Sequence, residues 1–147
     1  MAGTPAHGLW NYALYFFEAA ELVNERGPGK LNIPKYYLIC HALELGLKAF
    51  LNYKGVSLKD LKNPEKFGHD LQALFGKARE LGLRKKFKYT SGQWWAIRSM
   101  YGYYKGKRLE YLYRGSKTFP AYSALKSTVE GLLCGISLAI RGRVGLR

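Results

Sequence analysis

The residues of this 147-residue chain that are best suited to acid–base chemistry fall into two groups. His41, Glu44 and Lys48 follow one another at spacings of three and four, so on a helix they share one face about a turn apart. His69 and Asp70 form the second group, directly before a segment of periodic apolar residues. An imidazole held by a carboxylate can act as a general base, and Glu44 could supply that carboxylate.

The alternative for the same residues is a structural role. Adjacent side chains on a helix point in different directions, which weakens a joint chemical role for His69 and Asp70. Asp70 favours the positive end of a helix, and His69 or Gly68 can tie that end to Glu44. Because a buried charge requires a partner, we favour the structural role and predict no catalytic residues. The predicted structural polar network comprises His41, Glu44, Lys48, His69 and Asp70.

A metal site is the second use that this stripe could have. His41 and Glu44 have the spacing of two ligands on one helix face, with His69 or Asp70 to complete the set. Metal sites in helical bundles need matching ligand pairs from other helices, and the remaining acids are scattered along the chain. The phosphate-binding patterns GxxxxGK[ST] and GxGxxG are both missing from the sequence. We therefore expect no metal and no cofactor.

The strongest electrostatic feature is residues 84–117, called here the basic aromatic segment. It holds ten Lys or Arg residues against one acid, Glu110, and carries +9 of the chain's net charge of +14. Six Tyr, two Trp and Phe87 lie between these cations. Cations attract a polyanion, and aromatic faces stack on unpaired bases. Alternatively, the aromatic residues pack a core and the cations only solvate its surface.

We interpret the basic aromatic segment as a binding surface for RNA, single-stranded nucleic acid or a nucleotide. The predicted contact residues are Arg84, Lys85, Lys86, Lys88, Trp94, Trp95, Arg98, Tyr101, Tyr104, Lys105, Lys107, Arg108, Tyr111, Tyr113 and Arg114.

The sequence predicts that helices carry both groups of candidate residues. Apolar residues recur at helical spacing, and no strand-like alternation is evident. The length fits one domain, residues 1–147, that ends in a frayed basic tail at 141–147. We predict an all-α fold, an antiparallel up-and-down bundle of four to five helices. The expected helices cover residues 9–25, 33–54, 70–82, a stretch from about 91 past 104, and a last one from 120.

The chain's composition predicts a cytoplasmic protein with no membrane partner. Cys40 and Cys134 lie in apolar helical segments, where a buried free thiol behaves as a small hydrophobe. No signal-peptide pattern opens the sequence. The longest apolar stretch, residues 132–140, falls short of the roughly 20 residues that a membrane helix needs.

Three short elements mark the second and third expected helices: Ala-Leu-Glu at 42–44, Leu-Lys-Ala at 47–49 and Gly-His-Asp-Leu at 68–71. In their types and spacing they resemble the HEPN superfamily of small all-helical domains, over about residues 9–82. The resemblance implies a bundle of four or five helices that often dimerises. Many members are metal-independent ribonucleases of toxin, abortive-infection or defence systems. Others are inactive partners of nucleotidyltransferases, or nucleotide-binding modules.

The active members of that superfamily use an Arg followed four to six residues later by a His, near the end of a late helix. The His residues of this chain are His7, His41 and His69, and none of them follows an Arg at that distance. The resemblance therefore implies a non-catalytic, homodimeric binding module.

Two alternatives stay open. One is a divergent ribonuclease in which Arg98, Arg108 or Arg114 stabilises phosphate charge while a Tyr or His69 replaces the missing His. The other is a protein-interaction partner of a nucleotidyltransferase or another acidic protein.

Overall fold

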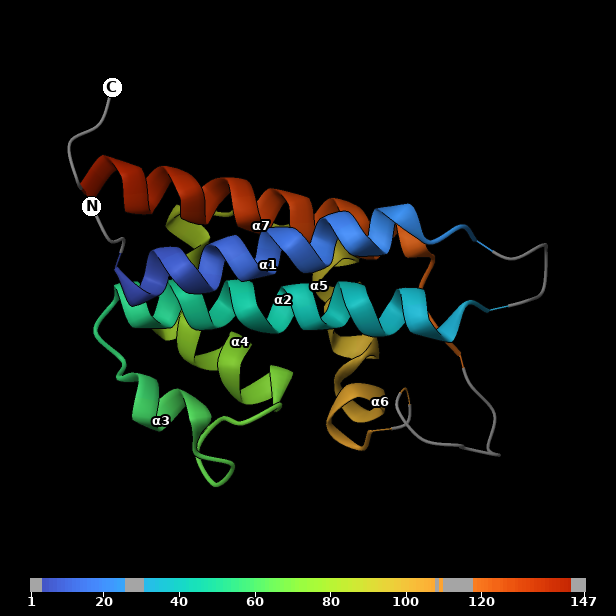
Figure 1. Ribbon diagram of the computed structural model, residues 1–147, viewed down its shortest axis with the longest axis horizontal. Coiled ribbons are helices and arrows are strands. Elements are labelled where there is room, and N and C mark those ends of the chain that lie inside the picture. The colour runs from blue at the N-terminus through green and yellow to red at the C-terminus, as the bar shows by residue number, and fades with distance from the viewer. Residues whose placement is uncertain (1–3, 26–30, 108, 110–117, 144–147) are drawn as a thin grey trace.

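The computed structural model describes residues 4–25, 31–107, 109 and 118–143, with side chains through Arg141. Within these ranges the regular structure is entirely helical, which confirms the predicted all-α class (Figure 1). The helices are α1 (Pro5–Leu22), α2 (Ile33–Tyr53), α3 (Leu58–Lys62), α4 (Leu71–Glu80), the 3-10 turn η1 (Leu83–Lys85), α5 (Ser91–Ser99), α6 (Tyr101–Lys105) and α7 (Tyr122–Arg143). Residues 141–143 of the expected frayed tail are helical, because α7 continues to Arg143, and residues 144–147 lie outside the described ranges.

Local capping decides where the first two helices begin. Asn32 accepts a hydrogen bond from the Lys35 amide at 3.2 Å, so α2 begins where the sequence pattern predicts. The first helix begins before the predicted Leu9, because Thr4 accepts from the His7 amide at 3.1 Å and Pro5 suits the first turn.

The centre of the fold is α2, which packs against α1, α4 and α7. In Figure 1 the three long helices α7, α1 and α2 lie side by side, and α4 and α5 pack against them. The interface of α1 uses small side chains, since Ala6, Ala13 and Ala20 are all buried. Lys35 of α2 closes the end of α1, because its Nζ donates to the carbonyl oxygens of Ala20 and Val23 at 2.7 and 2.6 Å.

The expected long helix from residue 91 past 104 is divided in the structure. It forms α5 and α6, with the buried Met100 at the junction. The Ser99 hydroxyl donates to the carbonyl oxygen of Trp95 at 2.8 Å, and such bonding within the last turn favours a bend over a straight helix. The division changes the direction of the second half, so residues 101–105 turn toward α4.

Glycines of α7 fix the start of the basic aromatic segment on the core. A Cβ atom at Gly135 would clash with the carbonyl oxygen of Lys86, and one at Gly131 would stand 2.8 Å from Cε1 of Phe87. The backbone of residues 86 and 87 therefore lies directly on α7, where Phe87 is buried.

Two sequence-based expectations about apolar segments need correction. Cys40 is buried as expected, whereas Cys134 is exposed on α7. Residues Tyr122–Arg141 are long and apolar enough to span a membrane by length and composition, although the 132–140 run alone is too short. Half of that stretch is buried inside the fold, and core helices of globular domains meet the same criteria.

Candidate nucleic-acid interface and buried polar network

A buried carboxylate lies at the centre of the polar cluster on α2. Glu44 is only 2% exposed and accepts hydrogen bonds from three side chains. Lys48 Nζ lies 2.7 Å from Oε2, His69 Nδ1 lies 2.9 Å from Oε1, and the Tyr104 hydroxyl also donates to Oε1. Glu44 therefore links α2 to the start of α4 and to α6.

His41 extends this cluster at the surface of α2. Its Nδ1 lies 2.7 Å from the Tyr104 hydroxyl oxygen and 3.7 Å from Oε1 of Glu44. Because the single Tyr104 proton is directed at Glu44, we assign the proton between the two rings to Nδ1 of His41. The His41 ring packs edge-on against Phe16 and stacks on Tyr37, so aromatic side chains hold its orientation.

The surroundings of Glu44 decide its charge. Burial alone would raise the pKa of this carboxyl, but the Lys48 charge and the hydrogen bonds from Lys48, Tyr104 and His69 outweigh it and hold the pKa below its ordinary value. Burial and the adjacent Glu44 charge raise the pKa of Tyr104 far above the ordinary value. At neutral pH the cluster thus contains a carboxylate and a neutral phenol.

Asp70 belongs to a neighbouring contact. Its Oδ1 caps α4 by accepting from the Ala73 amide at 3.1 Å, and its Oδ2 accepts from Lys105 Nζ at 2.9 Å. Burial acts to raise the pKa of Asp70, but the hydrogen bonds from Lys105 and the capping amides and the Lys105 charge outweigh burial. The pKa of Asp70 therefore lies below its ordinary value. Asp70 and Glu44 therefore hold α6 at two places, one exposed to solvent and one buried.

The Glu44 and His69 pair has the arrangement of an oriented imidazole. The His69 side chain is 56% exposed, while its Nδ1 donates to the buried carboxylate. The second ring nitrogen, Nε2, has no hydrogen-bond partner within the described ranges. Such a nitrogen can accept a proton from a bound group.

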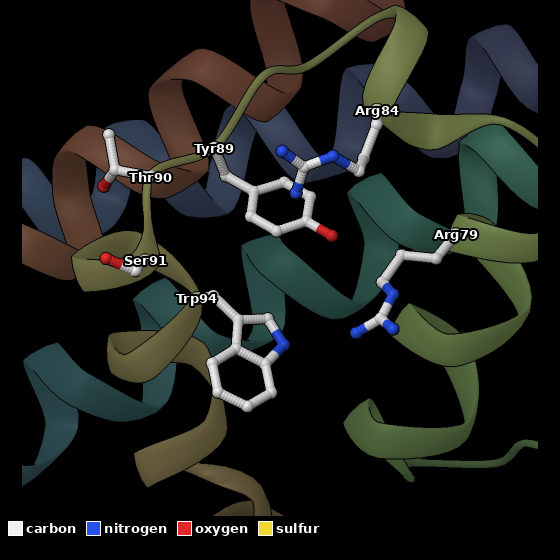
Figure 2. Close-up of a pocket in the computed structure, with 6 residues that line it drawn as sticks. All are labelled: Arg79, Arg84, Tyr89, Thr90, Ser91 and Trp94. Atoms are coloured by element: carbon white, nitrogen blue, oxygen red, sulfur yellow. The ribbon is translucent and has the colours of Figure 1, made fainter.

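A cavity of about 370 Å³ lies between the end of α4, η1 and the start of α5. Figure 2 shows its lining: the two guanidinium groups approach it from the α4 and η1 side, and the Trp94 ring faces them from α5. The lining residues are Arg79, Arg84, Tyr89, Thr90, Ser91 and Trp94.

Aromatic rings hold the arginines of this cavity. The Arg84 guanidinium carbon lies 4.5 Å above the Tyr89 ring centre, and Tyr89 itself is buried against Phe75 and Phe87. The Arg79 guanidinium carbon lies 5.9 Å from the Phe75 ring centre. Stacking through the face of a guanidinium leaves its N–H edge available for an anion.

The charged side chains that line the cavity are all positive. Its lining holds two arginines and no carboxylate, and neither Arg79 nor Arg84 has an ion-pair partner within 4.0 Å among the described residues. The Thr90 and Gln93 capping box places the first turn of α5 at the cavity, and the positive end of a helix dipole favours an anion there. The cavity is thus suited to a phosphate beside an aromatic face.

The structure distributes the predicted contact residues over several environments. Arg84 and Trp94 line the cavity, and the Arg98 guanidinium carbon lies 5.1 Å from the Trp94 ring centre. Tyr101 is half-buried, and Lys105 is paired with Asp70. Arg84, Arg98 and Lys105 are exposed, and so are the remaining described members other than Tyr104: Lys85, Lys86, Lys88, Trp95 and Lys107. Arg108, Tyr111, Tyr113 and Arg114 lie outside the described residues.

Tyr104 requires a correction. The sequence pattern assigns it to the nucleic-acid surface, but the residue is 5% exposed and its hydroxyl is directed at Glu44. Its place in α6, after the bend at Met100, turns the ring into the core instead of toward solvent.

Arg79 is a cavity residue that the sequence pattern missed. It precedes the basic aromatic segment and belongs to the preceding helix, α4. The sequence does contain one indication of its role. Arg79 and Arg84 lie five residues apart on either side of the Gly82 turn, so their side chains can meet at one site.

In the part of the chain that the structure describes, no group of three or more His, Cys, Asp or Glu side chains is arranged to hold a metal ion. No protein-family model, curated protein or solved structure matches this chain.

Proposed function

We propose that this protein is a non-catalytic module that binds RNA or other single-stranded nucleic acid, or a nucleotide, on a basic aromatic surface centred on the cavity. The main observation in support of this proposal is that Arg79, Arg84 and Trp94 line one cavity that contains no carboxylate. Arginine forks bind phosphate oxygens, and an indole face stacks on a base.

The surrounding cations support a strand longer than one nucleotide. Lys85, Lys86 and Lys88 are exposed, and the contacts of residues 86 and 87 with α7 fix the backbone that carries them. These lysines lie in sequence between Arg84 and Tyr89, two residues that line the cavity, and exposed cations attract a polyanion at a distance.

We also propose the finer architecture and identity: an antiparallel, up-and-down, HEPN-like bundle that forms a homodimer in the cytoplasm. Support comes from the helix α2 that bears the Ala-Leu-Glu and Leu-Lys-Ala elements and from the start of α4 at the Gly-His-Asp-Leu element. The hydrogen bond between His69 and Glu44 joins the Ala-Leu-Glu element to the Gly-His-Asp-Leu element.

The direct test is binding of a labelled, mixed-sequence 12-nucleotide RNA, followed by fluorescence anisotropy at several salt concentrations. We expect the logarithm of affinity to fall linearly with the logarithm of salt concentration, because bound phosphates release counterions. Absence of binding at low salt, with the protein shown to be folded, would contradict the proposal.

A second candidate function, a divergent metal-independent ribonuclease, is favoured by one observation: His69 is exposed and held by Glu44. Loss of a general base typically lowers a rate by roughly 100-fold to 10,000-fold. RNA cleavage that persists through purification and disappears in His69→Gln would establish this function in place of the non-catalytic one.

A further inference from the structure

We propose that the cavity lined by Arg79, Arg84 and Trp94 binds a terminal phosphate monoester of a nucleotide in preference to an internal phosphodiester of a strand. This inference rests on the proposed function, because it names the part of the nucleic acid that the same cavity recognises. The ligand has one chemistry, a nucleoside monophosphate group, which either a strand end or a free mononucleotide can supply.

Charge is the first argument. The two guanidinium groups give the lining two positive charges with no carboxylate to offset them. An internal phosphodiester carries one negative charge, whereas a phosphate monoester carries roughly −1.5 to −2 at neutral pH because its second pKa is about 6. A monoester therefore balances both positive charges of the cavity, whereas a diester balances only one of them.

Hydrogen-bond geometry is the second argument. Each guanidinium presents a planar fork of donors that binds two oxygens, and Arg84 is held in place by its contact with the Tyr89 ring. A monoester offers three terminal oxygens, and a diester offers two.

Size is the third argument. A volume of about 370 Å³ lies near the lower end of the range for small-molecule sites, roughly 300 to 1,000 Å³. Such a cavity fits a single nucleotide, with the phosphate at the arginines and the base against Trp94. Figure 2 shows the open space between the Arg79 guanidinium and the Trp94 ring that this placement requires.

The experiment compares one 12-nucleotide RNA with a 5′-phosphate and the same RNA with a 5′-hydroxyl, in direct binding at 0.1 M salt. We expect the phosphorylated strand to bind about tenfold more tightly, which corresponds to one charge-assisted hydrogen bond. Lowering the pH from about 7.5 to about 5.5 should reduce this preference, because the monoester becomes protonated.

Variants assign the preference to the cavity. Arg79→Gln and Arg84→Gln should each reduce the preference for the 5′-phosphate, while Lys62→Gln, the same charge change at an exposed position of α3, should retain it. Thermal melts of each variant confirm that the fold persists. A preference that survives both arginine changes would place its origin elsewhere and overturn the inference.

Competition with adenosine monophosphate and adenosine identifies the source of the ligand. Displacement by the monophosphate but not by adenosine supports a site that accepts free nucleotides, and preference for the phosphorylated strand without displacement supports a strand end. Equal affinity for the two strands overturns this inference and leaves the proposed function standing. Failure of both strands to bind overturns both.

Discussion

The hydroxyl of Tyr104 donates a hydrogen bond to the buried carboxylate of Glu44, and this bond joins α6 to α2 across 60 positions of sequence. The same carboxylate accepts from Lys48 and His69, so one buried charge holds three elements of the fold together. Tyr104, which the sequence pattern assigns to the nucleic-acid surface, is thus part of the core.

We predict that Tyr104→Phe lowers the free energy of unfolding by about 1 to 3 kcal/mol, because the buried Glu44 loses one donor. RNA affinity should stay within twofold, since the ring does not reach the surface. Urea unfolding measures the first effect, and anisotropy the second. Tyr12→Phe, at a 61% exposed position, is the control that should leave stability unchanged. Weakened RNA binding in a stable Tyr104→Phe protein would restore the surface role.

Glu44→Gln should destabilise the protein by roughly 3 kcal/mol at pH 7, because Lys48 remains buried without a countercharge. The pKa of Glu44 is lowered by folding, so its ionised form stabilises the fold above the ordinary carboxyl pKa of about 4, and this contribution is lost as pH falls. Unfolding measured from pH 7 to pH 3 should therefore show the difference between parent and variant shrinking below about pH 4. A constant difference over that range would indicate that the carboxylate charge is unimportant.

Gly135→Ala should destabilise the protein by about 1 to 3 kcal/mol, because the added methyl group would displace the carbonyl oxygen of Lys86. The matched control is Gly76→Ala in α4, where a Cβ atom meets nothing within 4 Å. That change should be neutral or stabilise by roughly 0.5 to 1 kcal/mol, as for Gly to Ala within a helix. Equal effects on the urea midpoints of the two variants would contradict the close approach of residue 86 to α7.

Trp94 should report the bound base. Stacking on an indole quenches its fluorescence, so RNA should quench the parent protein and quench Trp94→Phe much less. Trp95 provides the matched comparison, because it is the adjacent residue of α5, is 65% exposed and does not line the cavity. Quenching that depends on Trp95 instead would move the binding surface to another face of α5.

Local signals account for the parts of the fold that the sequence predicts well. The start of α2 follows from Asn32 and Pro34, and its end precedes Gly55, which adopts a φ of 105° that suits glycine. By contrast, the bend at Met100 depends on a Ser99 contact and on burial against other helices. Patterns within a single helix contain no information about such packing.

The candidate site was predictable only in part, for a related reason. Arg84 and Trp94 belong to a segment whose charge and aromatic content are evident in the sequence. Arg79 reaches the same cavity from α4, and its part in the site depends on how α4 and α5 are placed relative to each other. The composition of the basic aromatic segment assigns Tyr104 to the surface. The bend before α6 instead turns its side chain into the core, and composition contains no information about that bend.

The most direct measurement compares two double variants that remove the same charge. Arg79→Gln with Arg84→Gln removes the cavity arginines, and Lys59→Gln with Lys62→Gln removes two exposed lysines of α3. We predict that the first pair lowers RNA affinity at least about tenfold and reduces the slope of affinity against salt by about 2, because two phosphate contacts are lost. The second pair should change affinity by less than about threefold, since only long-range attraction is reduced. Equal losses in the two double variants would show that net charge alone attracts the RNA and would contradict a binding site at the cavity.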